Sequence, residues 1–148
     1  MSARWTSSLL SLLRVVVGFL FVVHGTQKLF GFPAPAPGGL FDLTTMLGAA
    51  GLIEVIGGAL IIAGLFTRAA AFVLAGEMAV AYFQMHAPKG FWPILNGGEL
   101  AVLYCFTFLF MVAAGGGRWS LDALIGRSRA SRSTTVEAEP QPSRRWAA

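Results

Sequence analysis

The sequence is poor in the residues that carry much of protein chemistry. Its one cysteine, Cys105, cannot form an intramolecular disulfide, and no CxxC pair is present for dithiol chemistry. Its two histidines are too few to build a His/Cys metal cluster from this chain, so the sequence predicts no metal site. Only 12% of its 148 residues are charged, about half the usual share of a soluble domain. This shortage of charge argues against a soluble globular protein.

Apolar residues, by contrast, make up 55% of the chain and fall into four blocks. Each block has about 18–22 residues, enough for a helix to cross a hydrocarbon core of about 30 Å. The blocks run over 9–30, 48–66, 69–86 and 97–114. All seven prolines lie outside them, as expected for punctuation between helices. The predicted fold is therefore all-α, an integral membrane four-helix bundle.

The basic residues predict the orientation of this bundle. Arg4, Arg68 and Arg118 fall at one set of helix ends, and Lys28 and Lys89 fall at the other. Because cytoplasmic loops carry the excess of Lys and Arg, we expect both the N- and C-termini in the cytoplasm. The expected location is the cell inner (plasma) membrane, with the chain passing through it several times.

The charge is concentrated in the last residues of the chain. The net charge is +4, and residues 127–148 hold five Arg and two Glu, a balance of +3. We therefore divide the chain into a four-helix transmembrane domain, 1–126, and a disordered Arg-rich cytoplasmic tail, 127–148. No aromatic–basic surface is visible, so nucleic acid is not an expected partner. Arg14, near the inner end of the first block, is expected to snorkel toward the interface.

Three of the blocks contain a glutamate, which costs a few kcal/mol inside a membrane helix. These residues are Glu54, Glu77 and Glu99, and the first block adds His24 and Lys28. At about 1.5 Å per residue, the antiparallel threading brings these groups together in the outer half of the bundle. We expect at least one Glu–His or Glu–Lys contact between helices. Two interpretations stay open: the groups hold the bundle together, or they form a site for a polar head such as a quinone ring or for a proton.

Four strings in the sequence resemble those of a known family. They are HGTQKLFGF (24–32), GLIEVIGGALIIAGLFTR (51–68), NGGELAVLYCFTFLF (96–110) and GGGRWSLD (115–122). Together they resemble the DoxX family of bacterial membrane proteins over about residues 10–125. The family's motif positions correspond here to His24, Lys28, Glu54, Arg68, Asn96, Glu99, Ser120 and Asp122.

The resemblance implies a four-helix membrane protein and, by analogy only, a link to oxidoreductases. The family is named after similarity to small subunits of an archaeal thiosulfate:quinone oxidoreductase. Some mycobacterial members are linked to a membrane complex with a thiosulfate sulfurtransferase and a superoxide dismutase. Fold similarity alone does not establish such an activity. The sequence shows no haem, flavin or metal signature, so any redox chemistry must use a diffusible quinone or a partner subunit.

Three functions are compatible with these observations. The first is a membrane subunit of a quinone- or thiol-linked oxidoreductase, with a soluble or membrane oxidoreductase as its partner. The second is a carrier for a small solute or protons, for which a homo-oligomer could supply the room that four short helices lack. The third is a non-catalytic assembly subunit in the lipid bilayer that docks a soluble enzyme through residues 118–148. Whether the protein is an enzyme stays open, and no catalytic residue is assigned. The candidates for ligand binding or proton relay are His24, Lys28, Glu54, Glu77, Asn96 and Glu99.

Overall fold

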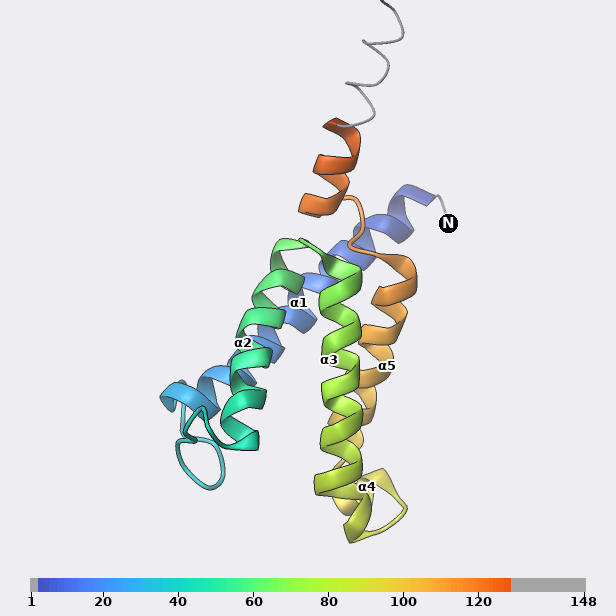
Figure 1. Cartoon of the computed structure of the whole chain (residues 1–148). Coiled ribbons are helices and arrows are strands. Elements are labelled where there is room, and N and C mark those ends of the chain that lie inside the picture. Colours follow the sequence, from blue (N-terminus) through green and yellow to red (C-terminus); the bar gives the residue numbers. More distant parts are fainter. Residues whose placement is uncertain (1–2, 129–148) are drawn as a thin grey trace, which may run out of the picture.

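The structure, a computed structural model, describes residues 3–128 and is helical (Figure 1). Its elements are α1 (Ala3–Phe30), α2 (Met46–Ala63), α3 (Thr67–Ala81), a π-helical turn η1 (Tyr82–His86), a 3-10 turn η2 (Ala87–Lys89), α4 (Pro93–Asn96) and α5 (Glu99–Ala114). A further helical segment covers 121–128. No strand occurs within residues 3–128, so the all-α prediction is confirmed.

Two of these helices are long and apolar enough to cross a membrane. They are Arg4–Phe30 and Met46–Ala63, and a shorter apolar helix covers Glu99–Ala114. The four predicted blocks correspond to α1, α2, α3 with η1, and α5, within a few residues at most of their ends. The largest difference is at the start of α1, which begins at Ala3 rather than at the first apolar run.

Helices α1 and α2 pack closely because glycines face each other across the contact. A Cβ on Gly25 would lie 2.6 Å from the carbonyl oxygen of Gly51. About two helical turns away, a Cβ on Gly18 would lie 3.0 Å from the carbonyl oxygen of Gly58. Both glycines of each helix are seven residues apart and so share a face. Small residues let helix backbones approach closely in a membrane, and here they bring the side chains of α1 and α2 into direct contact.

Helices α3 and α5 form the second pair and contribute most of the core. Phe21 of α1 packs edge-on against Tyr104 and Phe108 of α5, with ring centroids 5.1 and 4.9 Å away. Leu74 of α3 is fully buried in the same cluster, and so is Met111 of α5. These contacts join α1 to the second pair of helices.

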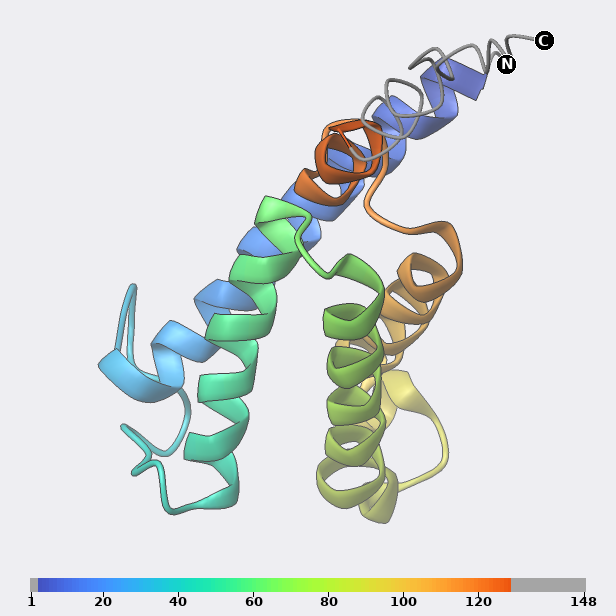
Figure 2. The same ribbon diagram turned by 45° about the horizontal axis from the view of Figure 1, so that its top comes forward.

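The turn between α2 and α3 is short, and the two helices diverge beyond it. Gly64, with φ of 68°, ends α2, and the amide of Leu65 donates to the carbonyl of Leu60, which is a Schellman ending. From this turn α2 and α3 separate toward their far ends, which both views show (Figures 1 and 2). The two pairs of helices therefore form a wedge whose apex is the α2–α3 turn.

The described chain ends lie at the apex end of the molecule. The start of α1 and the segment 121–128 lie there, and the loop 31–45 and the connection 82–98 lie at the opposite end (Figure 1). Residues 127 and 128 continue the helical segment, whereas the rest of the predicted tail, 129–148, lies outside the described residues.

Candidate functional site

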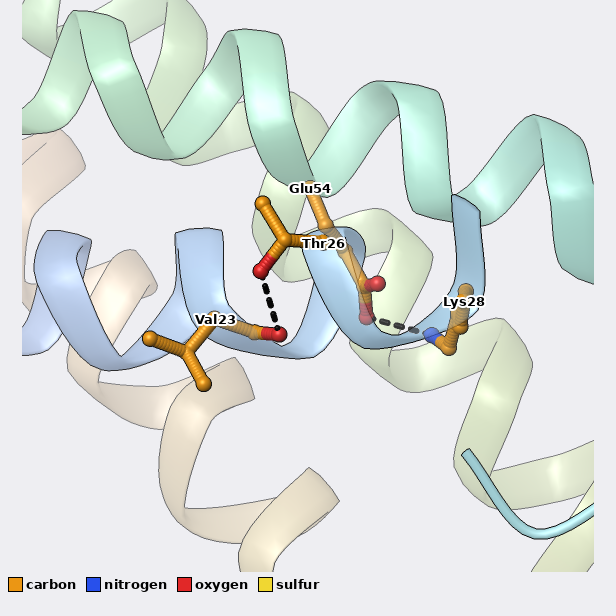
Figure 3. A network of polar contacts seen from close by, with 4 residues as sticks. All are labelled: Val23, Thr26, Lys28 and Glu54. Atoms are coloured by element: carbon orange, nitrogen blue, oxygen red, sulfur yellow. Dashed lines mark hydrogen bonds and ion pairs between the residues drawn. The ribbon is translucent and has the colours of Figure 1, made fainter. Parts of the chain in front are cut away.

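An ion pair joins the last turn of α1 to the middle of α2. The Nζ atom of Lys28 lies 2.6 Å from Oε1 of Glu54 (Figure 3). The side chain of Glu54 is 3% exposed and that of Lys28 is 21% exposed. The close approach of the two backbones explains the contact, because a Cβ on Gly51 would lie 3.1 Å from Cβ of Lys28. The predicted Glu–Lys contact between helices is thus confirmed.

The ion pair leaves one oxygen of Glu54 available. Its Oε2 atom is buried and has no hydrogen-bond partner among residues 3–128. In the same stretch of α1, the hydroxyl of Thr26 lies 3.0 Å from the carbonyl oxygen of Val23 (Figure 3). The carbonyl oxygen of Phe32 is 2.9 Å away, so the two carbonyls share one hydroxyl proton and the chain after α1 is tied to its last turns. The Lys28–Glu54 ion pair therefore lies beside a helix end that Thr26 ties to the following loop.

A cavity of about 240 Å³ lies beside this ion pair, and we call it the polar cavity. It is lined from α1, α2, α3, η1 and α5, with one residue from the turn before α5. Its lining residues are Phe21, His24, Lys28, Glu54, Met78, Ala81, His86, Gly97, Leu100, Ala101 and Tyr104. Both histidines of the chain are in this set, although they are 62 positions apart in the sequence.

The two histidines are held in different ways. The ring of His24 lies edge-on to that of Tyr104, with centroids 6.1 Å apart. His86 stacks on Tyr82 at 6.3 Å, and its Nδ1 lies 3.1 Å from the backbone carbonyl oxygen of Asn96. Since a carbonyl only accepts, Nδ1 of His86 carries the proton and Nε2 is left as the acceptor. His86 is in the π-helical turn, a deviation from α-helix that is frequent at functional sites.

Asn96 holds His86 rather than lining the cavity. Its side-chain amide donates to the carbonyl of Gly90 at 2.8 Å, and its Oδ1 accepts from the amide of Gly98 at 2.8 Å. The residue is buried and ends α4, so it ties the connection between α3 and α5 to itself. The structure therefore gives this candidate a positioning role.

Glu77 lines a second cavity, of about 320 Å³, between α2 and α3, which we call the apolar slot. The slot is lined by Lys28, Met46, Leu47, Ala49, Ala50, Ile53, Val73, Glu77, Met78, Val80, Ala81 and Met85. It shares Lys28, Met78 and Ala81 with the polar cavity, so the two lie next to each other. Both carboxyl oxygens of Glu77 are buried, and neither has a hydrogen-bond partner in the part of the chain that the structure describes.

Glu99 is not brought to either cavity. It is exposed and stands in the first turn of α5, where a carboxylate is favoured by the helix dipole. Of the six predicted candidates, the structure brings His24, Lys28 and Glu54 together. It places Glu77 in the adjoining slot and leaves Asn96 and Glu99 outside both cavities.

The remaining motif residues gather at the apex of the wedge. The Oδ1 and Oδ2 atoms of Asp122 accept from the amides of Phe66 and Thr67 at 2.9 and 2.8 Å, so Asp122 caps α3 from another part of the chain. Ser120 accepts from the amide of Ala123 and caps its own segment, as its position predicts. Arg68 donates to the carbonyls of Val112 and Ala113 at the end of α5.

Asp122 lies outside the apolar helices, and its pKa reflects these contacts. Burial alone would raise the pKa of its carboxyl. The hydrogen bonds from Thr67 and Phe66, together with the nearby Arg14, outweigh this and hold the pKa below its ordinary value. The carboxylate is therefore the form that the apex stabilises.

The expectation that Arg14 snorkels is wrong. The residue is 1% exposed, and its guanidinium donates to the carbonyls of Gly116, Ile61, Ile62 and Trp119. The carbonyls of Ile61 and Ile62 belong to the last turn of α2, where a helix runs short of backbone donors, although the amide of Gly64 also donates to Ile61. Burial is favoured because Arg14 supplies these donors at a point where three segments meet.

Sequence reasoning also missed His86. It is the last residue of the third apolar block, close to Pro88. The available signal was its rarity, because it is one of two histidines in the chain. Only the fold shows that it faces the same cavity as His24.

Comparisons with known proteins relate the chain to a family and to two bacterial sequences. The profile of the DoxX family matches residues 9–87, a little over half of the chain. An uncharacterized protein of Haemophilus influenzae is 51% identical over 117 residues, which cover 76% of this chain and 87% of that protein. An uncharacterized membrane protein of Mycobacterium tuberculosis is 28% identical over 131 residues, covering 78% of this chain and 80% of that protein. No solved structure matches the chain.

Proposed function

The chain belongs to the DoxX family of membrane proteins, and from this premise we propose that its polar cavity binds the head of a membrane quinone. The protein would then act as a membrane subunit of a quinone- or thiol-linked oxidoreductase. One observation carries the proposal: both histidines of the chain and the Lys28–Glu54 ion pair line the same cavity. Polar groups that cost free energy inside a membrane are here gathered around an open space.

The cavity suits a substituted ring in size and in chemistry. A cavity of about 150 Å³ is enough to admit benzene, and this one is about 240 Å³. The rings of Phe21 and Tyr104 form an apolar wall against which a flat ring can lie. The Lys28 ammonium and the imidazole of His24 are donors for the carbonyl oxygens of a quinone, and Nε2 of His86 is an acceptor for the hydroxyl of a quinol.

We further propose that the chain crosses the inner membrane four times, with both termini in the cytoplasm. The 15 residues of α3 and the five of η1 together span about 30 Å, comparable with the hydrocarbon core. The start of α1, the α2–α3 turn with the start of α3, and the segment after α5 lie at the apex end of the molecule (Figure 1). These segments carry Arg4, Arg68 and Arg118, so the positive-inside rule assigns the apex end to the cytoplasm. The polar cavity would then lie in the outer half of the membrane.

Electron transfer requires a partner in this proposal. A quinol that is oxidised loses two electrons and two protons. The protons leave through the histidines, and the electrons pass to a redox group on a partner subunit. The proposed partner is a soluble or membrane oxidoreductase, and a homo-oligomer of this chain is also compatible with the exposed apolar surface of the helices.

Binding of decylubiquinone to the purified protein tests the quinone site. We expect saturable binding that weakens about tenfold or more in His24→Ala, which removes a wall of the cavity and a donor. Glu99→Gln is the matched control, because Glu99 is exposed and lines neither cavity. Absence of saturable binding to the wild-type protein, or equal binding by His24→Ala, would overturn the proposal.

Reporter fusions test the orientation. Alkaline phosphatase fused within the loop 31–45 or near Gly90 is expected to be active, because it is exported. Fused after residue 128 it is expected to be inactive. An active fusion after residue 128 would reverse the proposed orientation, and differing results at the two loops would contradict four spans.

A further inference from the structure

Glu77 has no role in the quinone site, yet its carboxyl group is buried in a place where ionisation costs free energy. Both of its carboxyl oxygens are buried, and neither has a donor within the described residues. An ionised carboxylate without a partner is very costly in an apolar environment. The group therefore needs either a proton of its own or a cation that arrives from outside.

The charged neighbours do not supply that cation. The groups that face Glu77 are Lys28 of α1 and Glu54 of α2, and the former lines the same slot. Lys28 is already paired with Glu54 at 2.6 Å, so the two charges balance each other. An ionised Glu77 would thus be a third charge that no group among residues 3–128 balances.

The walls of the slot are adaptable. Three of the five methionines of the chain line it, namely Met46, Met78 and Met85. Unbranched, polarizable Met side chains accommodate varied apolar ligands. At the rim, Val73 and Val80 are exposed, so in a membrane the slot faces the acyl chains.

From these observations we propose that the apolar slot binds a membrane-soluble amine, with Glu77 as its counter-ion. The amine enters in its neutral form from the membrane. The O–H bond of the Glu77 carboxyl breaks and an N–H bond forms, which leaves an ammonium paired with a carboxylate. No net charge enters the membrane in this step, and the apolar part of the amine fills the slot of about 320 Å³.

An amine fits the slot better than a neutral alcohol of the same length. An alcohol donates one hydrogen bond but leaves the charge of the carboxylate unbalanced, so Glu77 keeps its proton. A charged donor balances the carboxylate and makes the stronger, charge-assisted hydrogen bond. The proposal does not depend on quinone binding, which uses the other cavity.

Infrared difference spectroscopy with decylamine and decanol tests this directly. The protein in lipid is expected to show the carbonyl-stretch band of a protonated carboxyl, which Glu77→Gln removes and Glu99→Gln keeps. Decylamine is expected to remove the band from the wild-type protein, and decanol is expected to leave it. A band that is absent from the wild-type protein, or that persists with decylamine, would overturn the proposal, as would its removal by decanol.

Two further measurements keep the test independent of any folding defect. Labelling glutamate carboxyl groups with ¹³C shifts the band without any substitution. Ala50→Phe, which fills the slot from α2, is expected to lower decylamine affinity about tenfold or more while keeping the band. Decylubiquinone binding by Glu77→Gln is expected to be unchanged, so failure of the amine site and failure of the quinone site give different results.

Discussion

At the scale of single residues, the two partners of the Lys28–Glu54 pair are buried to different extents, so removing one should cost more stability than removing the other. The side chain of Glu54 is 3% exposed and that of Lys28 is 21% exposed. If the ammonium is removed, the carboxylate stays where it is, already with one oxygen unpartnered. If the carboxylate is removed, the long Lys side chain can still turn toward the helix end.

Lys28→Met should therefore destabilise the protein more than Glu54→Gln. Removing one partner of a buried pair costs about 3–5 kcal/mol, and the Lys28 variant should lie near that range. The double variant Lys28→Met/Glu54→Gln should recover part of the loss, because no uncompensated charge remains. Thermal unfolding in detergent measures all three, and an equal loss in both single variants would contradict the unequal burial.

At the scale of helices, glycine has opposite meanings at two positions. Gly25 faces the backbone of α2, where a Cβ would lie 2.6 Å from the carbonyl oxygen of Gly51. Gly76, in the interior of α3, has nothing within 4 Å of the position of a Cβ. Gly25 permits a close approach, whereas Gly76 contributes only the backbone freedom that weakens a helix.

Gly25→Ala should consequently lower the stability of the α1–α2 pair, and Gly76→Ala should raise stability by about 0.5–1 kcal/mol. The first change pushes against backbone, which cannot yield as a flexible side chain would. Unfolding midpoints of the two variants, measured side by side, check the prediction. Opposite signs are expected, and stabilisation by both would mean that the helices are not in backbone contact at Gly25.

The start of α3 depends on a residue from far along the chain. Phe66, which precedes α3, makes no side-chain cap, and Asp122 accepts from the amides of Phe66 and Thr67 instead. Asp122→Ala should cost about 1–2 kcal/mol, the scale of a lost cap, and should increase hydrogen exchange at these two amides. Asp42→Ala is the control, since the carboxylate of Asp42 makes no hydrogen bond within residues 3–128.

The same cap makes stability depend on acid. The pKa of Asp122 is lower in the folded protein than its ordinary value, so its contribution is fully present above the ordinary value. The contribution is lost as the pH falls through the lower, folded pKa. The difference in stability between the wild-type protein and Asp122→Ala should therefore be constant near neutral pH and shrink in strong acid. A difference that grew in acid would contradict the direction of the pKa.

At the scale of the whole molecule, Arg14 joins α1, the end of α2 and the segment 116–119. Arg14→Lys keeps the charge but loses the planar fork that reaches four carbonyls. We expect a loss of about 3 kcal/mol or more and earlier proteolysis within 115–128, since several buried acceptors lose their donor. Arg4→Lys, on the exposed start of the same helix, should change neither stability nor proteolysis. If Arg14→Lys were as stable as the wild-type protein, the charge alone would suffice.

The sequence predicted the helices and the Glu–Lys contact because both depend on local pattern and on antiparallel threading. The helices follow from block length and proline placement. The Glu–Lys contact follows from the depth at which Lys28 and Glu54 lie in the bundle. The sequence did not predict the burial of Arg14 or the position of His86, because these depend on how helix ends meet in space. Glu99 was expected in the site, but its place in the first turn of α5 leaves it at the surface.

The wedge between the two helix pairs has a mechanical consequence. Helix α3 has 15 residues and is about 22 Å long, and Asp122 holds its first turn. A rotation of about 5° at that turn would move the far end by about 2 Å over such a length. The geometry of the Asp122 cap, at the apex, would therefore set the width of the apolar slot that contains Glu77.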